Sequence, residues 1–84
     1  MTIYNVIITI IDEGNIKQQS VASFTTTEKA NDYLSSQYES YKTDKSLIQD
    51  EEWDMMLFQD AKFNLWNGGF NVEVNGEVIP CELQ

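Results

Sequence analysis

The sequence predicts an α+β domain, in which an antiparallel sheet has one main helix packed on one of its faces. Two observations support this fold class. Apolar residues alternate along both ends of the chain, as they do in strands whose side chains point to two faces in turn. Between these ends, a helix-capping pattern precedes apolar residues spaced three and four apart. Because 84 residues suit one compact unit, we expect residues 1–84 to form a single domain.

The first two strands are expected to form a hairpin. Thr2 to Ile11 is apolar at many positions on both faces, which is typical of a central strand. The segment 12–15, Asp-Glu-Gly-Asn, has the composition of a turn. Ile16 to Phe24 is then expected to form a second strand that pairs back on the first.

A helix is expected after this hairpin. Thr25 and Glu28 fit a capping box, in which a threonine begins the helix and a glutamate three residues later bonds back to it. The apolar positions that follow fall on one stripe of a helix: Ala30, Tyr33, Leu34, Tyr38 and Tyr41. We expect the helix to end near Lys42, because a positive charge suits a helix C-terminus.

The segment 43–60 has two interpretations. Ser46 or Asp50 would cap a short second helix, in which Trp53 shares a face with the apolar residues after it. The alternative is a strand from Trp53 to Phe58. The capping residues favour the helix.

The C-terminal third is expected to form a three-stranded meander. Asn67-Gly68 and Asn75-Gly76 are both two-residue hairpin signals, because type I′ turns need positive φ at both positions. Turns at these places would put apolar residues into two cross-strand rows on a buried face, namely Leu65, Phe70 and Cys81, and Phe63, Val72 and Ile79. Pro80 lacks a backbone N–H, which suits an edge strand.

The charge of the chain restricts its partners. Fourteen acidic residues and five lysines, with no arginine, give a formal net charge of −9. Nucleic-acid-binding proteins neutralise phosphates with lysine and arginine, and an anionic membrane surface would repel this chain. We therefore expect no direct nucleic-acid partner and no membrane partner. A basic surface on another protein is the expected partner.

The residue types give little support to catalysis. The chain has no histidine, so it lacks the usual proton shuttle and the imidazole ligand of zinc sites. Cys81 has no histidine to activate it, and the expected meander makes it a small buried hydrophobe. Two carboxylates suffice for glycoside hydrolysis, but a chain of this size leaves little room for a substrate cleft. We expect no enzyme activity, no metal and no cofactor.

The single cysteine also bears on the compartment. It excludes an intramolecular disulfide, and small secreted domains usually need such cross-links. A cytoplasmic location is therefore expected.

An acidic cluster is the candidate partner-binding surface. Six acids fall within the seventeen residues from Asp44 to Asp60, where Lys45 is the one basic residue. Two tryptophans are near them in the sequence, and tryptophan is a frequent interface anchor. The candidate partner-binding residues are Asp44, Asp50, Glu51, Glu52, Trp53, Asp54, Asp60 and Trp66. Three alternatives stay open: the acids form a solvated face, they bind calcium without an EF-hand spacing, or Trp66 packs under a loop.

The run Phe24-Thr25-Thr26-Thr27-Glu28-Lys29-Ala30, which follows a hairpin and enters a helix, resembles a pattern in small uncharacterised bacterial and phage proteins. This resemblance covers about the first third of the chain and implies neither an activity nor a functional residue. In size, acidity and lack of arginine and histidine, the chain is also similar to phage-encoded inhibitors, including anti-CRISPR proteins and DNA mimics. That similarity in composition suggests a phage or mobile-element inhibitor of a host protein with a basic, nucleic-acid-binding surface. The alternatives are a structural homo-oligomer, such as a homodimer formed through an exposed strand edge, and an antitoxin or immunity protein.

Overall fold

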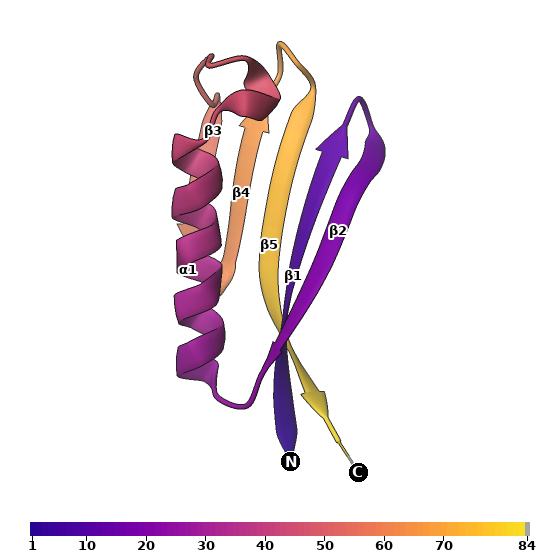
Figure 1. Ribbon diagram of the computed structural model, residues 1–84, viewed down its shortest axis with the longest axis vertical. Helices are drawn as coiled ribbons and strands as arrows, with labels where there is room; N and C mark the ends of the chain where they lie inside the picture. The colour runs from indigo at the N-terminus through magenta and orange to yellow at the C-terminus, as the bar shows by residue number, and fades with distance from the viewer. Residues whose placement is uncertain (84) are drawn as a thin grey trace.

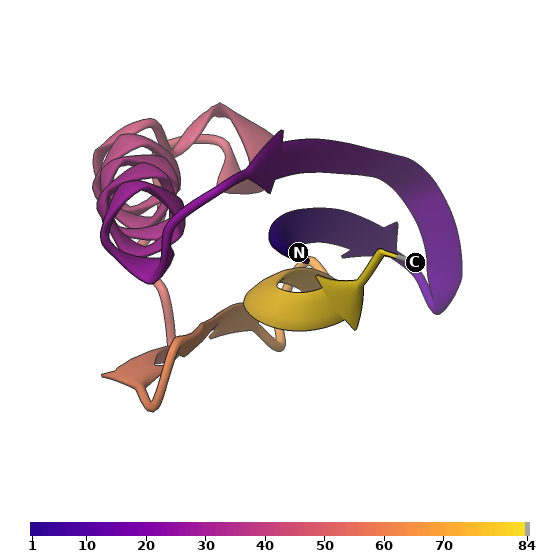
Figure 2. The ribbon, with the colours of Figure 1, turned by 90° about the horizontal axis from the view of Figure 1, so that it is seen from below.

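The computed structural model describes residues 1–83 and has the expected α+β fold (Figure 1). Its elements are β1 (Thr2–Asp12), β2 (Asn15–Phe24), α1 (Thr27–Thr43), the 3-10 turn η1 (Ser46–Ile48), β3 (Met55–Gln59), β4 (Lys62–Asn67) and β5 (Val72–Glu82). The strands form one antiparallel sheet in the order β2-β1-β5-β4-β3. Seen from below, the sheet is strongly curved, and α1 stands at its open side (Figure 2).

The predicted N-terminal hairpin is confirmed. β1 pairs with β2 through a turn at Glu13 and Gly14, whose φ angles of 52° and 81° are both positive. β1 also pairs with β5 along its length, so it is the central strand that its two apolar faces indicate. The pairing of β1 with β2 shifts register between Ile10 and Ile11, which marks a bulge.

The helix α1 begins one residue later than the capping pattern predicts. Thr26, rather than Thr25, is the N-cap, and its side-chain oxygen accepts a hydrogen bond from the Lys29 backbone N–H at 3.2 Å. The three consecutive threonines offer the same cap chemistry at neighbouring positions, so sequence alone could not choose between them. The predicted apolar stripe is confirmed, because Ala30 and Leu34 are buried and the three tyrosines pack against the core.

The helix favoured for the segment 43–60 is wrong. Helical structure there is limited to η1, and the strand that was the alternative forms as β3. Gln49 and Asp50 have φ angles of 52° and 65°, and consecutive left-handed residues cannot continue a right-handed helix. Beyond them, backbone pairing with β4 provides hydrogen bonds that the weak capping signals could not outweigh.

The C-terminal meander forms from β3, β4 and β5. The reversal expected at Asn67-Gly68 occurs as a longer turn, and the turn expected at Asn75-Gly76 does not form. The chain reverses at Asp60 and Ala61, whose φ angles are 53° and 59°, and again over residues 68–71. Asn75 and Gly76 lie inside β5, where Gly76 is opposite Phe63. A Cβ at Gly76 would overlap the Phe63 ring, so this glycine permits close packing and makes no turn.

The predicted register of the meander is therefore wrong. Leu65 pairs with Val74 and not with Phe70, while Phe63 pairs with Gly76 and not with Val72. Phe63, Leu65 and Val72 are nevertheless buried, as expected. Register and burial can disagree in this way because a shift by an even number of residues keeps each side chain on its own face.

The far end of β5 also departs from the prediction. Ile79 and Cys81 are exposed, because β5 runs without a turn through residues 75–76 and strand alternation then points them to the face opposite Val72 and Val74. β5 also extends beyond Glu77, the last residue that β4 pairs with. Pro80 lies on this extension, which pairs with β1 on one side and has no β4 partner on the other. β5 is therefore central where it is buried and an edge where it contains proline.

The core lies between α1 and the sheet face that α1 covers. It is built from β1, α1, η1, β4 and β5, and from the loop that precedes β3. Its buried side chains are Val6, Ile8, Ile10, Ala30, Leu34, Ile48, Trp53, Phe63, Leu65, Val72 and Val74. The other face of the sheet carries no helix (Figure 2). The two faces are therefore in different environments, which decides where a partner could bind.

Candidate partner-binding surface

The loop from α1 to β3 carries most of the candidate acids, and several of them shape the loop. Asp44 follows the end of α1, and its carboxylate accepts a hydrogen bond from the Ser46 N–H at 3.2 Å. The carboxylate of Glu52 lies 2.9 Å from the Lys45 ammonium. The Glu52 side chain is largely exposed, so this ion pair contributes little to stability.

Asn67 and Asp54 tie the loop to the end of β4. The buried Asn67 side chain donates to the Glu52 carbonyl at 2.7 Å and accepts from the Phe70 N–H at 2.8 Å. Asp54 accepts from the Gly68 N–H at 2.7 Å through its carboxylate and donates its own N–H to the Trp66 carbonyl at 2.8 Å. These bonds hold the end of the acidic loop against the β4–β5 turn.

The structure brings some of the predicted acids together and separates another. Glu51, Glu52 and Asp54 line a hollow of about 350 Å³, together with Asn67, Gly69 and Phe70. Asp60 lies in the β3–β4 turn, separated from Asp54 by the full length of β3. The acids therefore stand at both ends of β3 and do not form a single cluster.

The two candidate tryptophans differ in exposure. Trp53 is 5 % exposed and belongs to the core, so it is not available to a partner, and its indole Nε1 has no hydrogen-bond partner among residues 1–83. Trp66 is 36 % exposed. A Cβ at Gly68 would overlap the Trp66 ring, which therefore lies against the backbone of the β4–β5 turn. Trp66 therefore packs on a loop, which was one alternative, and also stays partly accessible, as an interface anchor would.

The most exposed run of apolar residues in the chain lies in β3, outside the residues that the sequence predicted for binding. Four consecutive residues of β3 are each 42–51 % exposed, namely Met55, Met56, Leu57 and Phe58. β3 is the last strand of the sheet, so the outer side of its backbone has no strand partner within residues 1–83. A signal for it was present, because an uncharged apolar run between Asp54 and Asp60 is typical of a segment prone to pair with another strand.

Trp66 extends this apolar segment across the sheet, because it is paired directly with Met55. We call the five residues Met55, Met56, Leu57, Phe58 and Trp66 the β3 edge surface. On the side of the helix, the rings of Phe58 and Tyr38 are in contact, with centroids 5.1 Å apart and planes at 62°. This contact anchors one end of β3 to α1 and leaves the outer edge free.

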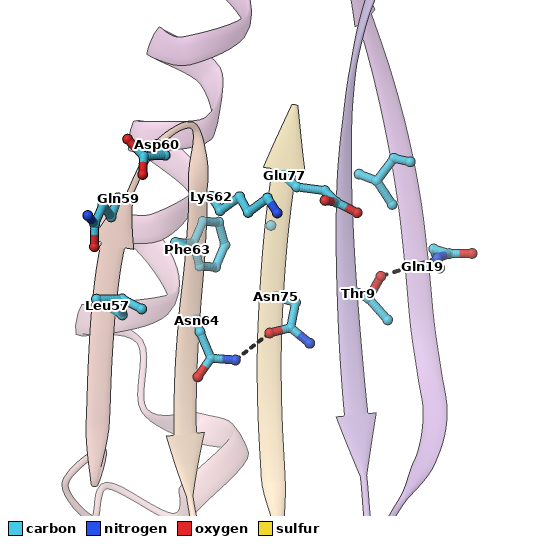
Figure 3. Close-up of a pocket in the computed structure, with 12 residues that line it drawn as sticks. Thr9, Gln19, Leu57, Gln59, Asp60, Lys62, Phe63, Asn64, Asn75 and Glu77 are labelled. Carbon is cyan, nitrogen blue, oxygen red and sulfur yellow. Dashed lines mark hydrogen bonds between the residues drawn. The ribbon is translucent and has the colours of Figure 1, made fainter. Parts of the chain in front are cut away.

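Beside the β3 edge surface, the face without a helix is hollowed, and both polar and apolar side chains line the hollow (Figure 3). One cross-strand row contains Leu57, Asn64, Asn75, Thr9 and Gln19. Within it, the Asn64 side-chain amide donates to Asn75, and the Gln19 amide donates to Thr9 at 3.2 Å. The Asn75 amide donates in turn to the Glu73 carboxylate, so these polar side chains form a ladder that supports the sheet.

Within residues 1–83, no group of three or more histidine, cysteine, aspartate or glutamate side chains is placed to hold a metal ion. Nor does any helix of that part of the chain combine the length and the apolar character needed to cross a membrane.

Comparisons with protein-family models, curated proteins and solved structures found no match.

Proposed function

We propose that this protein is not an enzyme and acts by binding another protein through the β3 edge surface. The observation that carries the proposal is the exposure of four consecutive apolar residues on an unpaired edge strand. Contiguous exposed apolar residues of this kind commonly mark protein interaction sites. Methionine, phenylalanine and tryptophan are also the residue types that protein interfaces favour.

The charges around this surface favour a basic partner. Asp54 and Asp60 stand at the two ends of β3, and Glu51 and Glu52 precede Asp54 in the loop. The arrangement is an apolar centre with an acidic rim, which resembles the anatomy of many protein interfaces. The net charge of −9 would steer a basic protein toward the chain and would repel acidic ones.

In its concrete form, the proposed function is inhibition of a host protein that handles nucleic acid. Such a protein has a basic surface, which an acidic protein could cover in place of the nucleic acid. A phage or mobile-element origin agrees with the small size and acidity, and the cytoplasm is the compartment in which the target would be met.

The first experiment uses the wild-type chain as bait in a lysate of the source organism, followed by binding kinetics with the purified target. The test variant carries Asp50→Asn, Glu51→Gln and Asp60→Asn, three exposed acids that flank the surface. A matched control carries Glu28→Gln, Asp32→Asn and Glu39→Gln, three exposed acids of α1. Both variants change the net charge by the same amount.

We expect the test variant, which neutralises Asp50, Glu51 and Asp60, to associate with the target about tenfold more slowly at low salt. The salt dependence of its association rate should also be flatter. The α1 variant should change both much less, because its charges lie away from the interface. If the two variants have equal effects, the association rate depends on net charge alone and not on where the acids lie. A bait that enriches no protein above a Trp66→Ala, Leu57→Asp bait would contradict the proposal.

A structural homo-oligomer is the second candidate, because an exposed edge strand can also pair with a copy of itself. Sedimentation equilibrium over a range of protein and salt concentrations decides between the two. A monomer at all concentrations supports the first candidate. A dimer that Leu57→Asp dissociates supports the second.

A further inference from the structure

The two edges of the sheet are protected very differently. β2 is mostly polar, carries Lys17, and pairs with β1 through a register shift that marks a bulge. Charged side chains and bulges are the devices by which proteins prevent strands from adding to an edge. β3 has neither a charged residue nor a proline, and its pairing with β4 shows no register shift. Of the two edges, β3 is therefore the one suited to accept another strand.

The β3–β4 turn determines which backbone groups of β3 point outward. The turn contains two residues, Asp60 and Ala61, both with positive φ, so Gln59 and Lys62 form its closing hydrogen-bonded pair. Residues of an antiparallel pair alternate between hydrogen-bonded and non-hydrogen-bonded positions. Counting back from Gln59, Met56 and Phe58 direct their N–H and C=O groups away from β4. These two residues are the points at which a further strand could bond.

From this geometry we propose that β3 binds an extended, basic segment of the partner protein as a sixth strand of the sheet. The inference rests on the proposed function and specifies how that surface binds. The segment's backbone would bond to Met56 and Phe58, and its alternate side chains would pack beside Met55 and Leu57 on the face without the helix. Recognition of this kind takes affinity from the backbone and specificity from the side chains.

The charges at the ends of β3 select this occupant over a second copy of the chain. Antiparallel pairing of two β3 strands over their whole length centres on Leu57, which places Asp54 of each copy opposite Asp60 of the other. Like charges directly opposite one another destabilise a strand pair, and each copy also has a net charge of −9. A segment with lysine or arginine at both ends, six residues apart, would instead pair with both aspartates.

The test uses a synthetic seven-residue peptide of alternating valine and threonine with a lysine at each end, and the same peptide with a glutamate at each end. Amide exchange of the full chain, followed by NMR, reports on the individual N–H groups. In the free protein, the Met56 and Phe58 amides should exchange quickly and the Leu57 amide slowly. The lysine peptide should slow exchange at Met56 and Phe58, and the glutamate peptide should bind at least about tenfold more weakly.

A pair of variants tests the backbone contact. Met56→Pro removes an N–H that β4 does not use, whereas Met56→Ala removes the same side chain and keeps the N–H. Met56→Pro should abolish binding of the lysine peptide and Met56→Ala should lower it only modestly. If Met56→Pro fails to fold, the exchange pattern of the wild-type chain still decides the question.

Three results would overturn this inference. Equal binding of the two peptides would show that the aspartates do not select a basic segment. Unchanged exchange at Met56 and Phe58 would show that no strand adds to β3. Protection of both amides that rises with protein concentration, without peptide, would assign the edge to a second copy.

If the purified target binds while both amides stay unprotected, strand addition fails and the proposed function stands. If no target exists, the proposed function fails independently of the peptide result.

Discussion

Leu65 and Leu57 are the same residue type on neighbouring strands of one hairpin, yet they occupy opposite environments. Leu65 on β4 faces α1 and is 0 % exposed, while Leu57 on β3 points to the other face and is 50 % exposed. The face under α1 is packed, with the Phe63 ring lying against Gly76. The open face is joined by side-chain amides and retains accessible apolar groups. One face of the sheet therefore packs the core, and the other stays accessible.

The largest expected effect comes from the covered face. Leu65→Ala should lower the free energy of unfolding by about 2–5 kcal/mol, through lost burial and the cavity that remains. Chemical denaturation at constant m-value measures the change. A loss below about 1 kcal/mol would mean that α1 does not pack on β4 as described.

The contact between Gly76 and Phe63 gives a test with a definite sign. Gly76→Ala would normally favour a strand interior, but here the added methyl group overlaps the Phe63 ring. We expect a loss of about 1–3 kcal/mol in the free energy of unfolding, measured by chemical denaturation. The double variant Gly76→Ala, Phe63→Leu should lose less than the two single changes together. A stabilising Gly76→Ala would contradict the close contact between this residue and the Phe63 ring.

The Asp60-Ala61 turn sets the register that separates the two faces, and Ala61 adopts a left-handed conformation at φ 59°. Ala61→Gly should raise the free energy of unfolding by about 0.5–1 kcal/mol, because glycine adopts this conformation without steric cost. Ala22→Gly, in β2, is the control and should lower stability instead. Thermal unfolding of both variants gives the comparison, and a destabilising Ala61→Gly would contradict the turn.

The smallest expected effect completes the comparison between the two leucines. Leu57→Ala should change the free energy of unfolding by less than about 0.5 kcal/mol, because the side chain is half exposed before the change. The same substitution should weaken partner binding, which titration calorimetry with the purified target measures. A stability loss as large as that of Leu65→Ala would show that the open face is covered in solution.

Prediction from the sequence succeeded where one local signal was sufficient. The Glu13-Gly14 turn lies between two strands whose alternation agrees with it, so the N-terminal hairpin needed no tertiary information. The helix stripe with Leu34 succeeded for the same reason, and its cap moved by one residue only because neighbouring threonines are equivalent. The acids beside β3 were visible in the sequence, but their division between the two ends of the strand was not.

Prediction failed where a local preference competed with packing. Asn75-Gly76 has a strong turn composition, yet Phe63 requires a glycine beneath its ring and β5 continues through it. Asp60-Ala61 has a weaker preference for positive φ but forms the turn, because it brings β3 alongside β4. Trp53 was a candidate anchor by its acidic neighbours and is buried by its contacts with the core.

The sequence by itself determined the α+β class, the first hairpin, the helix and the acidic character, because local periodicity, turn chemistry and composition specify these. Only the tertiary structure decided that β3 is an edge strand and that its four apolar side chains remain exposed. A uniformly apolar strand does not encode which of its sides is covered, since burial depends on the order of strands and on where the single helix lies. The surface proposed to bind a partner follows from that strand order.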